Sequence, residues 1–279
     1  RSIEIHNRPY LVNSIYFNLK NNKRLSLFLH NDPLEMKGSK TIEDRKNLLS
    51  KLERIYCVSE FIKKRFLIGI TDHLNKVVVL HNGVVRRQKT MPKKQKQIIY
   101  VGRIVKEKGV DLFVDAIKEI YEDFKDWNFK IIGSPKLGIN KFDNFSLKIK
   151  KDFESLGERA KMIGFINSKK LNKIMSDASV IVIPSVWNEP FGLVAAEAMS
   201  NGIAVISSSS GGLPEIVQDN GILINNINSK KIAKQLKKII LDTSLLKELQ
   251  KKSWKNFSFD SKTISSKLDD HRKKLFLKN

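Results

Sequence analysis

Two glutamates that are eight positions apart stand where α/β proteins commonly bind ligands. The apolar run 180–183 predicts a strand that ends in a polar loop, and the run 193–199 predicts a helix. Glu189 lies in the loop and Glu197 lies on the helix. Ligands sit at the carboxyl ends of parallel strands, and a helix N-terminus attracts phosphate. Because carboxylates accept hydrogen bonds from hydroxyl groups, the pair predicts a sugar-nucleotide site, with Glu197 at the ribose and Glu189 at the attached sugar.

Simpler interpretations of both glutamates stay open at this point. Glu189 would then only complement the positive end of the helix dipole. Glu197 would be a solvated helix position, although its apolar neighbours in the segment LVAAEAM favour a buried helix.

Arg103 and Lys108 predict a clamp for a diphosphate. Arg103 follows the apolar run 98–101, and Lys108 precedes a helix-forming segment that begins near Val110. An arginine offers a fork of donors and a lysine offers a point charge. Together they would neutralise charge on a departing diphosphate, for which the sequence shows no evident metal cluster. The simpler interpretation of such a pair is that both side chains are solvated.

Three short motifs occur in the order in which a known enzyme family has them. They are N-G-V at 82–84, G-R-x-x-x-x-K-G at 102–109 and E-P-F-G-L-x-x-x-E at 189–197. They resemble the motifs of retaining GT-B glycosyltransferases of family 4, the group 1 glycosyl transferases, and the resemblance covers most of the chain from about His30 onward. It implies an α/β fold of two Rossmann-like doubly wound domains. It also implies transfer of a sugar from a nucleoside diphosphate sugar to an acceptor hydroxyl, with retention at the anomeric carbon.

The resemblance also assigns roles to residues. Catalytic roles are expected for four side chains: Glu189, His30, Arg103 and Lys108. Donor binding is expected from a larger set: Arg103, Lys108, Glu189, Phe191, Gly192, Leu193, Val194, Glu197, Gly133, Phe165 and Ile166. Backbone N–H groups of 191–194 would hold the phosphates, and the loop at 165–166 would hold the base. No cofactor and no metal ion are expected beyond the donor substrate.

In the family, a histidine at the end of a first-domain strand faces the donor sugar. His30 ends the apolar run 25–30 and is the best positional match. His6, in a similar setting, is its rival for a role on the acceptor side. For both, the simpler interpretation is a structural histidine.

Strand patterns alternate with helix patterns, which predicts βαβ units and parallel sheets. Thr41 is a plausible N-cap of a helix over 41–53, with Asp44 in the capping-box position. The other expected helices of the first domain are 9–20 and 59–67. The expected strands are 2–6, 25–30, 55–58, 76–81, 98–101, 129–132, 161–163, 180–183, 203–206 and 222–224.

These elements predict two domains. Residues 1–88 would form a partial N-terminal, acceptor-side domain of Rossmann-like type, and a charged linker at about 86–96 would follow. Residues 97–257 would form the C-terminal nucleotide-sugar-binding domain, and the resemblance implies that a helix at 258–279 packs back on the first domain. The first domain has about four strands, whereas a complete doubly wound half has about six. It is therefore expected to be short or N-terminally incomplete.

Composition restricts the environment and the partners. The 279 residues are 41% hydrophobic and have no apolar run of the ~20 residues that span a bilayer. The single cysteine, Cys57, suits a reducing compartment, so a cytoplasmic protein is expected. The difference between 52 basic and 29 acidic residues gives a net charge of +23.

This charge has three interpretations: lysines that are merely abundant and solvated, attraction to an anionic membrane surface, or binding of nucleic acid. No nucleic-acid-binding motif accompanies the basic residues, so nucleic acid is not expected as a partner. Charge and resemblance together favour a glycan or lipid-linked acceptor at the inner face of the membrane, in synthesis of a cell-envelope polysaccharide such as lipopolysaccharide. The alternatives are a soluble acceptor, a nucleotide-sugar-binding fragment without turnover, and a basic nucleic-acid-binding protein.

Overall fold

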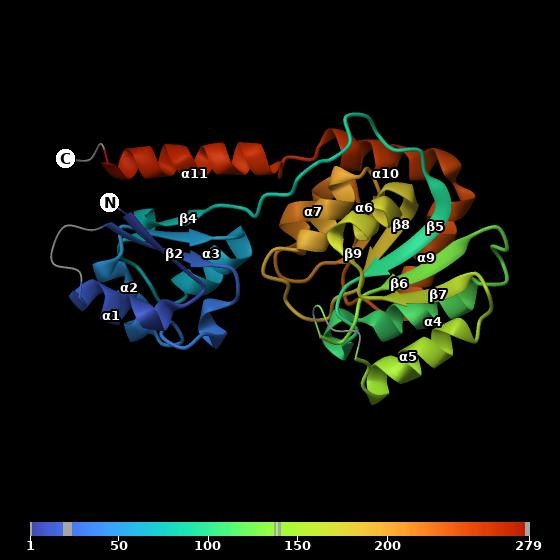
Figure 1. The fold of residues 1–279 in the computed structure, drawn as a ribbon, viewed down its shortest axis with the longest axis horizontal. Coiled ribbons are helices and arrows are strands. Elements are labelled where there is room, and N and C mark those ends of the chain that lie inside the picture. Colours follow the sequence, from blue (N-terminus) through green and yellow to red (C-terminus); the bar gives the residue numbers. More distant parts are fainter. Residues whose placement is uncertain (1, 19–23, 137, 139–140, 277–279) are drawn as a thin grey trace. The chain divides into compact units, whose positions relative to one another are not determined.

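The computed structural model describes residues 2–18, 24–136, 138 and 141–276. The chain divides into two compact units, drawn as ribbons in Figure 1. Unit 1 comprises Arg1–Gly83 and Phe259–Asn279, and unit 2 comprises Val84–Ser258. Both units are α/β structures with parallel sheets, which confirms the fold class expected from the sequence.

Unit 1 contains a sheet of four parallel strands in the order β1-β2-β3-β4. The strands are β1 (Ser2–His6), β2 (Arg24–Leu29), β3 (Arg54–Cys57) and β4 (Val77–Val79), and the helices between them in sequence are α1 (Val12–Asn18), α2 (Ile42–Lys51) and α3 (Glu60–Leu67). Thr41 and Asp44 form the expected capping box, because the backbone N–H of each bonds the other's side chain, at 3.0 and 3.1 Å. The expected helix 9–20 begins as a 3-10 turn at Pro9–Leu11, and its last two positions lie outside the described residues.

The C-terminal helix α11 (Ser261–Phe276) belongs to unit 1. Arg272 makes a forked ion pair with Glu4 of β1, with both N···O distances 2.7 Å. Ile264 is buried with Phe28 and Tyr56 of the sheet. Unit 1 is thus assembled from two segments of the chain that 175 intervening residues, Val84–Ser258, separate.

Unit 2 contains a parallel sheet of six strands in the order β10-β9-β8-β5-β6-β7. The strands are β5 (Gln95–Val101), β6 (Asn128–Ile132), β7 (Ala160–Gly164), β8 (Ala178–Ile183), β9 (Ala204–Ser208) and β10 (Ile222–Ile224). The helices are α4 (Val110–Ile120), α5 (Asn144–Glu154), α6 (Ser168–Asp177), α7 (Leu193–Ser200), α8 (Leu213–Val217), α9 (Ser229–Leu241) and α10 (Thr243–Lys255). The strand order reverses direction between β5 and β8, and this switch point is where doubly wound sheets bind ligands.

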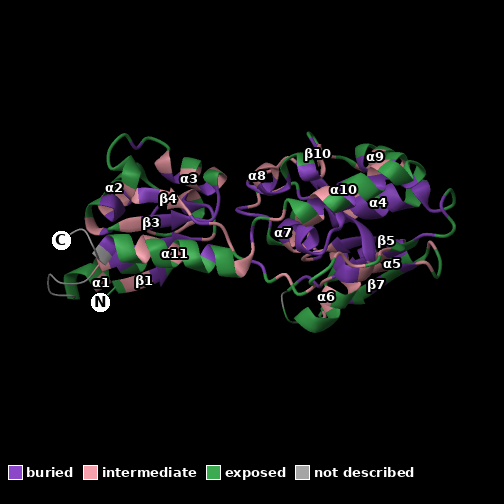
Figure 2. Cartoon of the chain, turned by 90° about the horizontal axis from the view of Figure 1, so that it is seen from above, coloured by how far each residue is buried: buried purple, intermediate pink, exposed green. Residues whose placement is uncertain are grey.

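Helices cover both faces of this sheet, with α4 and α5 on one face and α6 and α7 on the other (Figure 1). The central strand β8 is buried along its whole length, as expected for a parallel strand covered on both faces. Figure 2 shows the same division, with buried residues on the strands and exposed residues on the outer sides of the helices. The sheet therefore gives the loops at its carboxyl edge a rigid base.

The segment expected to be a linker, 86–96, is anchored to unit 2. Lys94 Nζ donates to the backbone oxygens of Ser176 and Asn201, at 3.0 and 2.6 Å, and burial lowers the pKa of this ammonium to about 7. Strand β5 starts at Gln95, which pairs with β8, so it takes the last two residues of the expected linker. The hydrophobic pattern could not predict that β5 starts here, because its first two residues, Gln95 and Lys96, are polar and the strand pairs through its backbone.

Candidate functional site

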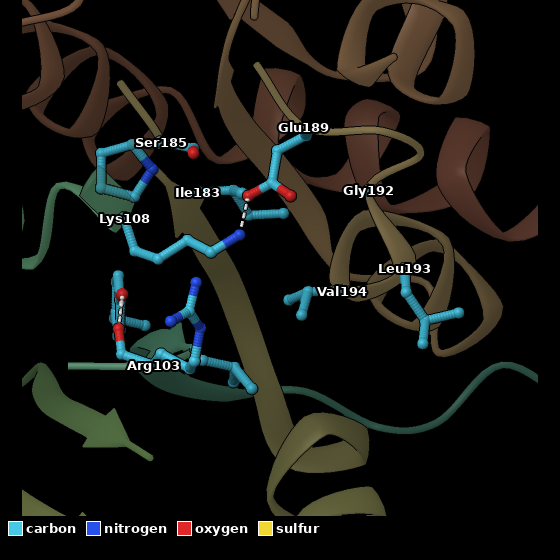
Figure 3. A pocket seen from close by; sticks show the side chains of 12 residues that line it. Arg103, Lys108, Ile183, Ser185, Glu189, Gly192, Leu193 and Val194 are labelled. Atoms are coloured by element: carbon cyan, nitrogen blue, oxygen red, sulfur yellow. Dashed lines mark hydrogen bonds and ion pairs between the residues drawn. The ribbon is translucent and has the colours of Figure 1, made fainter. Parts of the chain in front are cut away.

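Two adjoining hollows lie at the switch point of unit 2. The first, of about 260 Å³, is lined by the loops after β5 and β8 and by the first turn of α7 (Figure 3). The second, of about 190 Å³, extends towards the loops after β6 and β7. Val101, Gly102, Arg103 and Val194 line both hollows. They therefore form one extended site along the carboxyl edge of four strands.

An ion pair crosses the first hollow. Lys108 Nζ lies 2.5 Å from Glu189 Oε1, and the two side chains are only 18% and 13% exposed. In Figure 3 they point toward each other from opposite loops. The ammonium also lies 4.9 Å from the centre of the Trp187 ring, at cation–π distance. Lys108 is thereby held at the hollow, with its charge shared between a carboxylate and an aromatic face.

Arg103 is held less firmly than Lys108. Its guanidinium pairs with Glu107 at 2.5 Å, but the two side chains are 41% and 48% exposed. Such surface pairs contribute about 0–1 kcal/mol, so a phosphate can replace the carboxylate at little cost. The backbone of Arg103 is better fixed, because its carbonyl oxygen accepts a bond of 2.8 Å from the buried Tyr100 hydroxyl.

Gly133 keeps the two loops at the second hollow in contact. It has a φ of +144°, and a Cβ at this position would lie 1.8 Å from the carbonyl oxygen of Gly102. Any side chain would push apart the loops that follow β5 and β6. The glycine is therefore needed for close backbone packing, independently of any ligand.

The N-terminus of α7 opens onto the first hollow. Gly192 is the N-cap residue and supplies no side-chain hydrogen bond to the first turn. Leu193 and Val194 line the hollow and are the first two residues of the helix. N–H groups of a first helical turn have no partner within the helix, so these are available to an anion. Phe191, also expected at this point, is buried and lines neither hollow.

Glu197 is the fifth residue of α7 and lies about one turn inside the helix. It lines the second hollow with Phe165 and Ile166. Burial raises the pKa of its carboxyl group, and no charged neighbour offsets this. Even a partly buried carboxylate costs stability when no opposite charge lies beside it, so stability does not explain this residue. The arrangement instead suits an acceptor of hydrogen bonds from a ligand.

His30 belongs to unit 1, directly after β2. Its Nε2 lies 3.2 Å from Nδ1 of His6, and the two rings are stacked. Burial lowers the pKa of His30, and the nearby His6 lowers it further, while a hydrogen bond with Asn82 opposes the change. The two histidines that the sequence presents as rivals are therefore one adjacent pair.

The structure brings ten of the twelve expected site residues to the two hollows of unit 2. The first hollow has Arg103, Lys108, Glu189, Gly192, Leu193 and Val194, and the second has Gly133, Phe165, Ile166 and Glu197. Sequence reasoning missed Trp187, whose position two residues before Glu189 was a usable signal, and Tyr100, whose hydroxyl only a structure could place.

The described residues also limit two other kinds of site. Among them, no group of three or more His, Cys, Asp and Glu side chains is arranged to hold a metal ion. Within the same part of the chain, every helix is too short or too polar to span a membrane.

Comparison with known proteins identifies the family. Residues 83–256 match the family described as "Glycosyl transferases group 1". The chain belongs to the group 1 glycosyl transferases. Among curated members of the family, it is 31% identical over 229 residues to the uncharacterized glycosyltransferase MJ1178 of Methanocaldococcus jannaschii, and 28% identical to MJ1607 of the same organism. The matches cover 78% and 92% of this chain, which spans 60% and 72% of those relatives.

Solved structures of low sequence identity have the same fold as this family member. Anabaena Alr3699/HepE, solved in complex with UDP, is similar with a TM-score of 0.81 at 20% identity, over 97% of this chain and 78% of that one. The glycosyltransferase of Rickettsia africae is similar with a TM-score of 0.79 at 19% identity, over 99% of this chain and 77% of that one. At such low identity these similarities establish the GT-B fold alone.

The partial burial of Glu197, which raises the pKa of its carboxyl group, predicts a pH-dependent gain in stability for Glu197→Gln. The pKa of this carboxyl group is higher in the folded protein than in the unfolded chain. As the pH rises from the unfolded pKa to the folded pKa, the ionised group therefore lowers the free energy of unfolding. The glutamine cannot ionise, so the variant should melt about 2 °C or more above the parent at pH 8, and the difference should shrink at pH 4. Thermal melts at both pH values measure this.

The matched control for Glu197 is Glu122→Gln, which makes the same change at an exposed position of unit 2. It should leave the melting temperature unchanged at both pH values. A lower melting temperature for Glu197→Gln at pH 8 would mean that the carboxylate is stabilised by the fold.

Proposed function

We propose that this protein transfers a sugar from a nucleoside diphosphate sugar to an acceptor hydroxyl, with retention at the anomeric carbon. The observation that carries the proposal is the composition of the two hollows. One combines two cations, a carboxylate and an open helix N-terminus, and the other combines a partly buried carboxylate, with no opposite charge beside it, and an apolar loop. The first hollow matches the diphosphate of a nucleotide sugar, and the second matches its base and ribose.

The diphosphate would occupy the first hollow. Arg103 and Lys108 supply positive charge, and the first N–H groups of α7 supply donors together with the positive end of the helix dipole. The base and ribose would occupy the second hollow, with the base against Phe165 and Ile166 and the ribose hydroxyls donating to Glu197. The UDP complex of the structurally similar HepE supports a donor of this class.

Catalysis would consist of stabilising the departing diphosphate. The bond between the anomeric carbon and the phosphate oxygen breaks, the acceptor oxygen bonds to that carbon on the same face, and the acceptor proton passes to the leaving phosphate. Charge that develops on the diphosphate is met by Arg103, Lys108 and the helix N-terminus. No protein nucleophile is needed in this scheme, and no metal ion is proposed.

Glu189 is proposed to position the donor sugar and not to attack it. The 2.5 Å bond to Lys108 neutralises its charge and occupies one of its oxygens, which makes it a poor nucleophile. The second oxygen remains to accept a bond from a sugar hydroxyl. His30 is proposed to contribute from unit 1 as a neutral imidazole, since burial and His6 lower its pKa.

The acceptor is proposed to be a glycan or a lipid-linked sugar of the cell envelope, met at the inner face of the membrane. Support comes from the net charge of +23, because anionic lipid surfaces attract basic proteins by about 1 kcal/mol for each basic residue near them. No cofactor is proposed beyond the donor, and no nucleic acid is proposed as partner.

Arg103→Ala should weaken the binding of a nucleoside diphosphate by about 1.5 kcal/mol or more, because it removes a charge-assisted bond to phosphate. Calorimetry with UDP and with GDP measures this loss on whichever nucleotide the parent binds. Arg87→Ala is the matched control, since Arg87 is exposed and lines neither hollow. Equal affinities for the Arg103 variant and the parent would refute the clamp.

Glu189→Gln should lower turnover at least about tenfold without weakening the binding of a nucleoside diphosphate. The substitution disturbs the group beside the transferring sugar and releases Lys108 from its carboxylate. Donor hydrolysis and transfer assays give the turnover, and Glu122→Gln serves as control, since Glu122 is exposed and lines neither hollow. A parent that binds the nucleotide but neither hydrolyses nor transfers the sugar would instead support the binding fragment without turnover.

Association with a membrane should depend on lipid charge and on salt. The protein should co-sediment with vesicles that contain anionic phospholipid, stay in solution with vesicles of phosphatidylcholine alone, and leave the anionic vesicles as salt rises, because salt screens the attraction. Equal partitioning to both kinds of vesicle, or to neither, would mean that the basic residues are merely solvated.

A further inference from the structure

Two histidines meet where β1 and β2 of unit 1 end. The two strands are parallel neighbours, and His6, the last residue of β1, lies opposite Phe28 of β2. His30 follows β2 directly. Nδ1 of His6 lies 3.2 Å from Nε2 of His30, which is within hydrogen-bond distance. Each ring therefore acts directly on the other.

The residue after His6 also holds His30. The side-chain oxygen of Asn7 accepts a bond of 3.1 Å from the backbone N–H of His30, and the N–H of Asn7 donates to Phe28 O at 2.8 Å. Asn7 has a φ of +55°, in the left-handed region that asparagine tolerates better than most residues. Consecutive residues of one loop thus fix both the backbone and the ring of His30.

The ring of His6 rests on a buried aromatic support. It is stacked on Phe28, with centroids 4.3 Å apart and planes at 13°, and Phe28 is stacked in turn on Tyr56 at 4.5 Å. Both of these supporting rings are buried, whereas His6 is exposed and His30 is half-buried. His6 is therefore open to solvent while its Nδ1 is held against His30.

The facing nitrogens of the two rings can carry only one proton between them. A neutral imidazole has one N–H and one acceptor nitrogen, and a charged imidazole has two N–H groups. Two N–H groups that face each other at 3.2 Å would repel, so the contact requires a pair that is neutral or singly charged. Burial lowers the pKa of His30, and the nearby His6 lowers it further. A single charge on the pair is thus favoured on the exposed ring of His6.

This distribution of charge decides where the proton of His30 lies. A charged His6 has hydrogen on both nitrogens, so its Nδ1 donates to Nε2 of His30. His30 is then neutral and carries its own proton on Nδ1. A second proton would place hydrogen on both facing atoms and separate the rings.

The neighbouring loops add no competing charge to the bond. The other ionisable side chains on the loops after β1, β2 and β4 are Arg8, Asp32 and His81. Arg8 donates to the backbone oxygen of Asn7 at 3.0 Å. Asp32 pairs with Arg65 at 2.7 Å, and His81 lies against the ring of Phe259. Each of these side chains has a contact away from the two rings.

We propose that His6 is a positioning residue that fixes the tautomer of His30 through the bond between their facing nitrogens. The inference rests on the proposed transferase function and extends it, because it explains how the unit 1 histidine is prepared for its role. The hydrogen bond at one ring nitrogen determines which form the other nitrogen takes. A ring held in this way presents the same group to the substrate in every turnover.

Proton–nitrogen NMR correlation spectra of the imidazole rings distinguish the two tautomers and test the pairing without an activity assay. On the acid side of the His6 titration, the parent should show His30 as the Nδ1–H tautomer. His6→Phe keeps a ring on Phe28 but cannot make the bond. In this variant His30 should lose its single tautomer and ionise at a higher pH, because the neighbouring charge is gone.

His73→Asn is the matched control. His73 is an exposed histidine of unit 1, and its φ of +56° suits asparagine. The control should leave the His30 spectrum unchanged. The proposal falls if His30 of the parent has its proton on Nε2 under these conditions, or if His6→Phe leaves the spectrum of His30 as it is in the parent.

Turnover at pH 8 separates positioning from packing. His6→Phe should lower turnover at least about tenfold, and His6→Asn, which places an amide near the position of Nδ1, should stay within about threefold of the parent. If His6 only packs on Phe28, the order reverses, because phenylalanine keeps the ring contact and asparagine loses it.

Nucleotide binding identifies a failure of the proposed function. Both His6 variants should bind nucleotide as the parent does, since the two hollows belong to unit 2. A reversed order of turnover with unchanged nucleotide affinity would overturn the positioning role alone. A parent that transfers no sugar would contradict the transferase function, and the tautomer of His30 would then decide the pairing by itself.

Discussion

The ion pair between Lys108 and Glu189 is the interaction on which the site depends. It joins the loop after β5 to the loop after β8. These two neighbouring strands are the point at which the strand order of the sheet reverses. Both partners are largely buried, so loss of one would leave the other as a poorly solvated charge. Substitution of either residue thus changes two groups at once. The effect of a Glu189 variant on turnover has to be separated from the freeing of Lys108.

Charge is distributed unevenly along the carboxyl edge of the unit 2 sheet. The first hollow contains opposite charges in contact and an open helix end, and the second contains one carboxylate without an opposite charge beside it. In a nucleoside diphosphate the charge is confined to the diphosphate, and the ribose offers neutral hydroxyl donors. The proposed donor therefore matches the two hollows, which share four lining residues.

Much of the fold could be predicted from the sequence because its signals are local. Each strand of unit 2 contains apolar residues that mark it in the sequence, and Thr41 and Asp44 form a capping box three residues apart. The cations and carboxylates of the site were visible because charged residues at strand ends stand out. Contacts between distant segments were not visible: the pairing of His6 with His30 and the bond between Lys108 and Glu189 both require the folded backbone. Serine and asparagine in loops carry no signal of their own, since they are also ordinary turn residues.

The place of α11 in unit 1 affects how the chain folds during synthesis as well as how the folded unit is stabilised. During synthesis the ribosome completes all of Val84–Ser258 before it produces the helix that pairs Arg272 with Glu4. Unit 2 is one uninterrupted segment, so it can fold while unit 1 still lacks its last element. Contacts between residues so far apart in sequence form slowly, and partly folded domains expose apolar surface. Unit 1 is therefore begun before unit 2 and completed only after it, so its sheet is exposed for longer during translation.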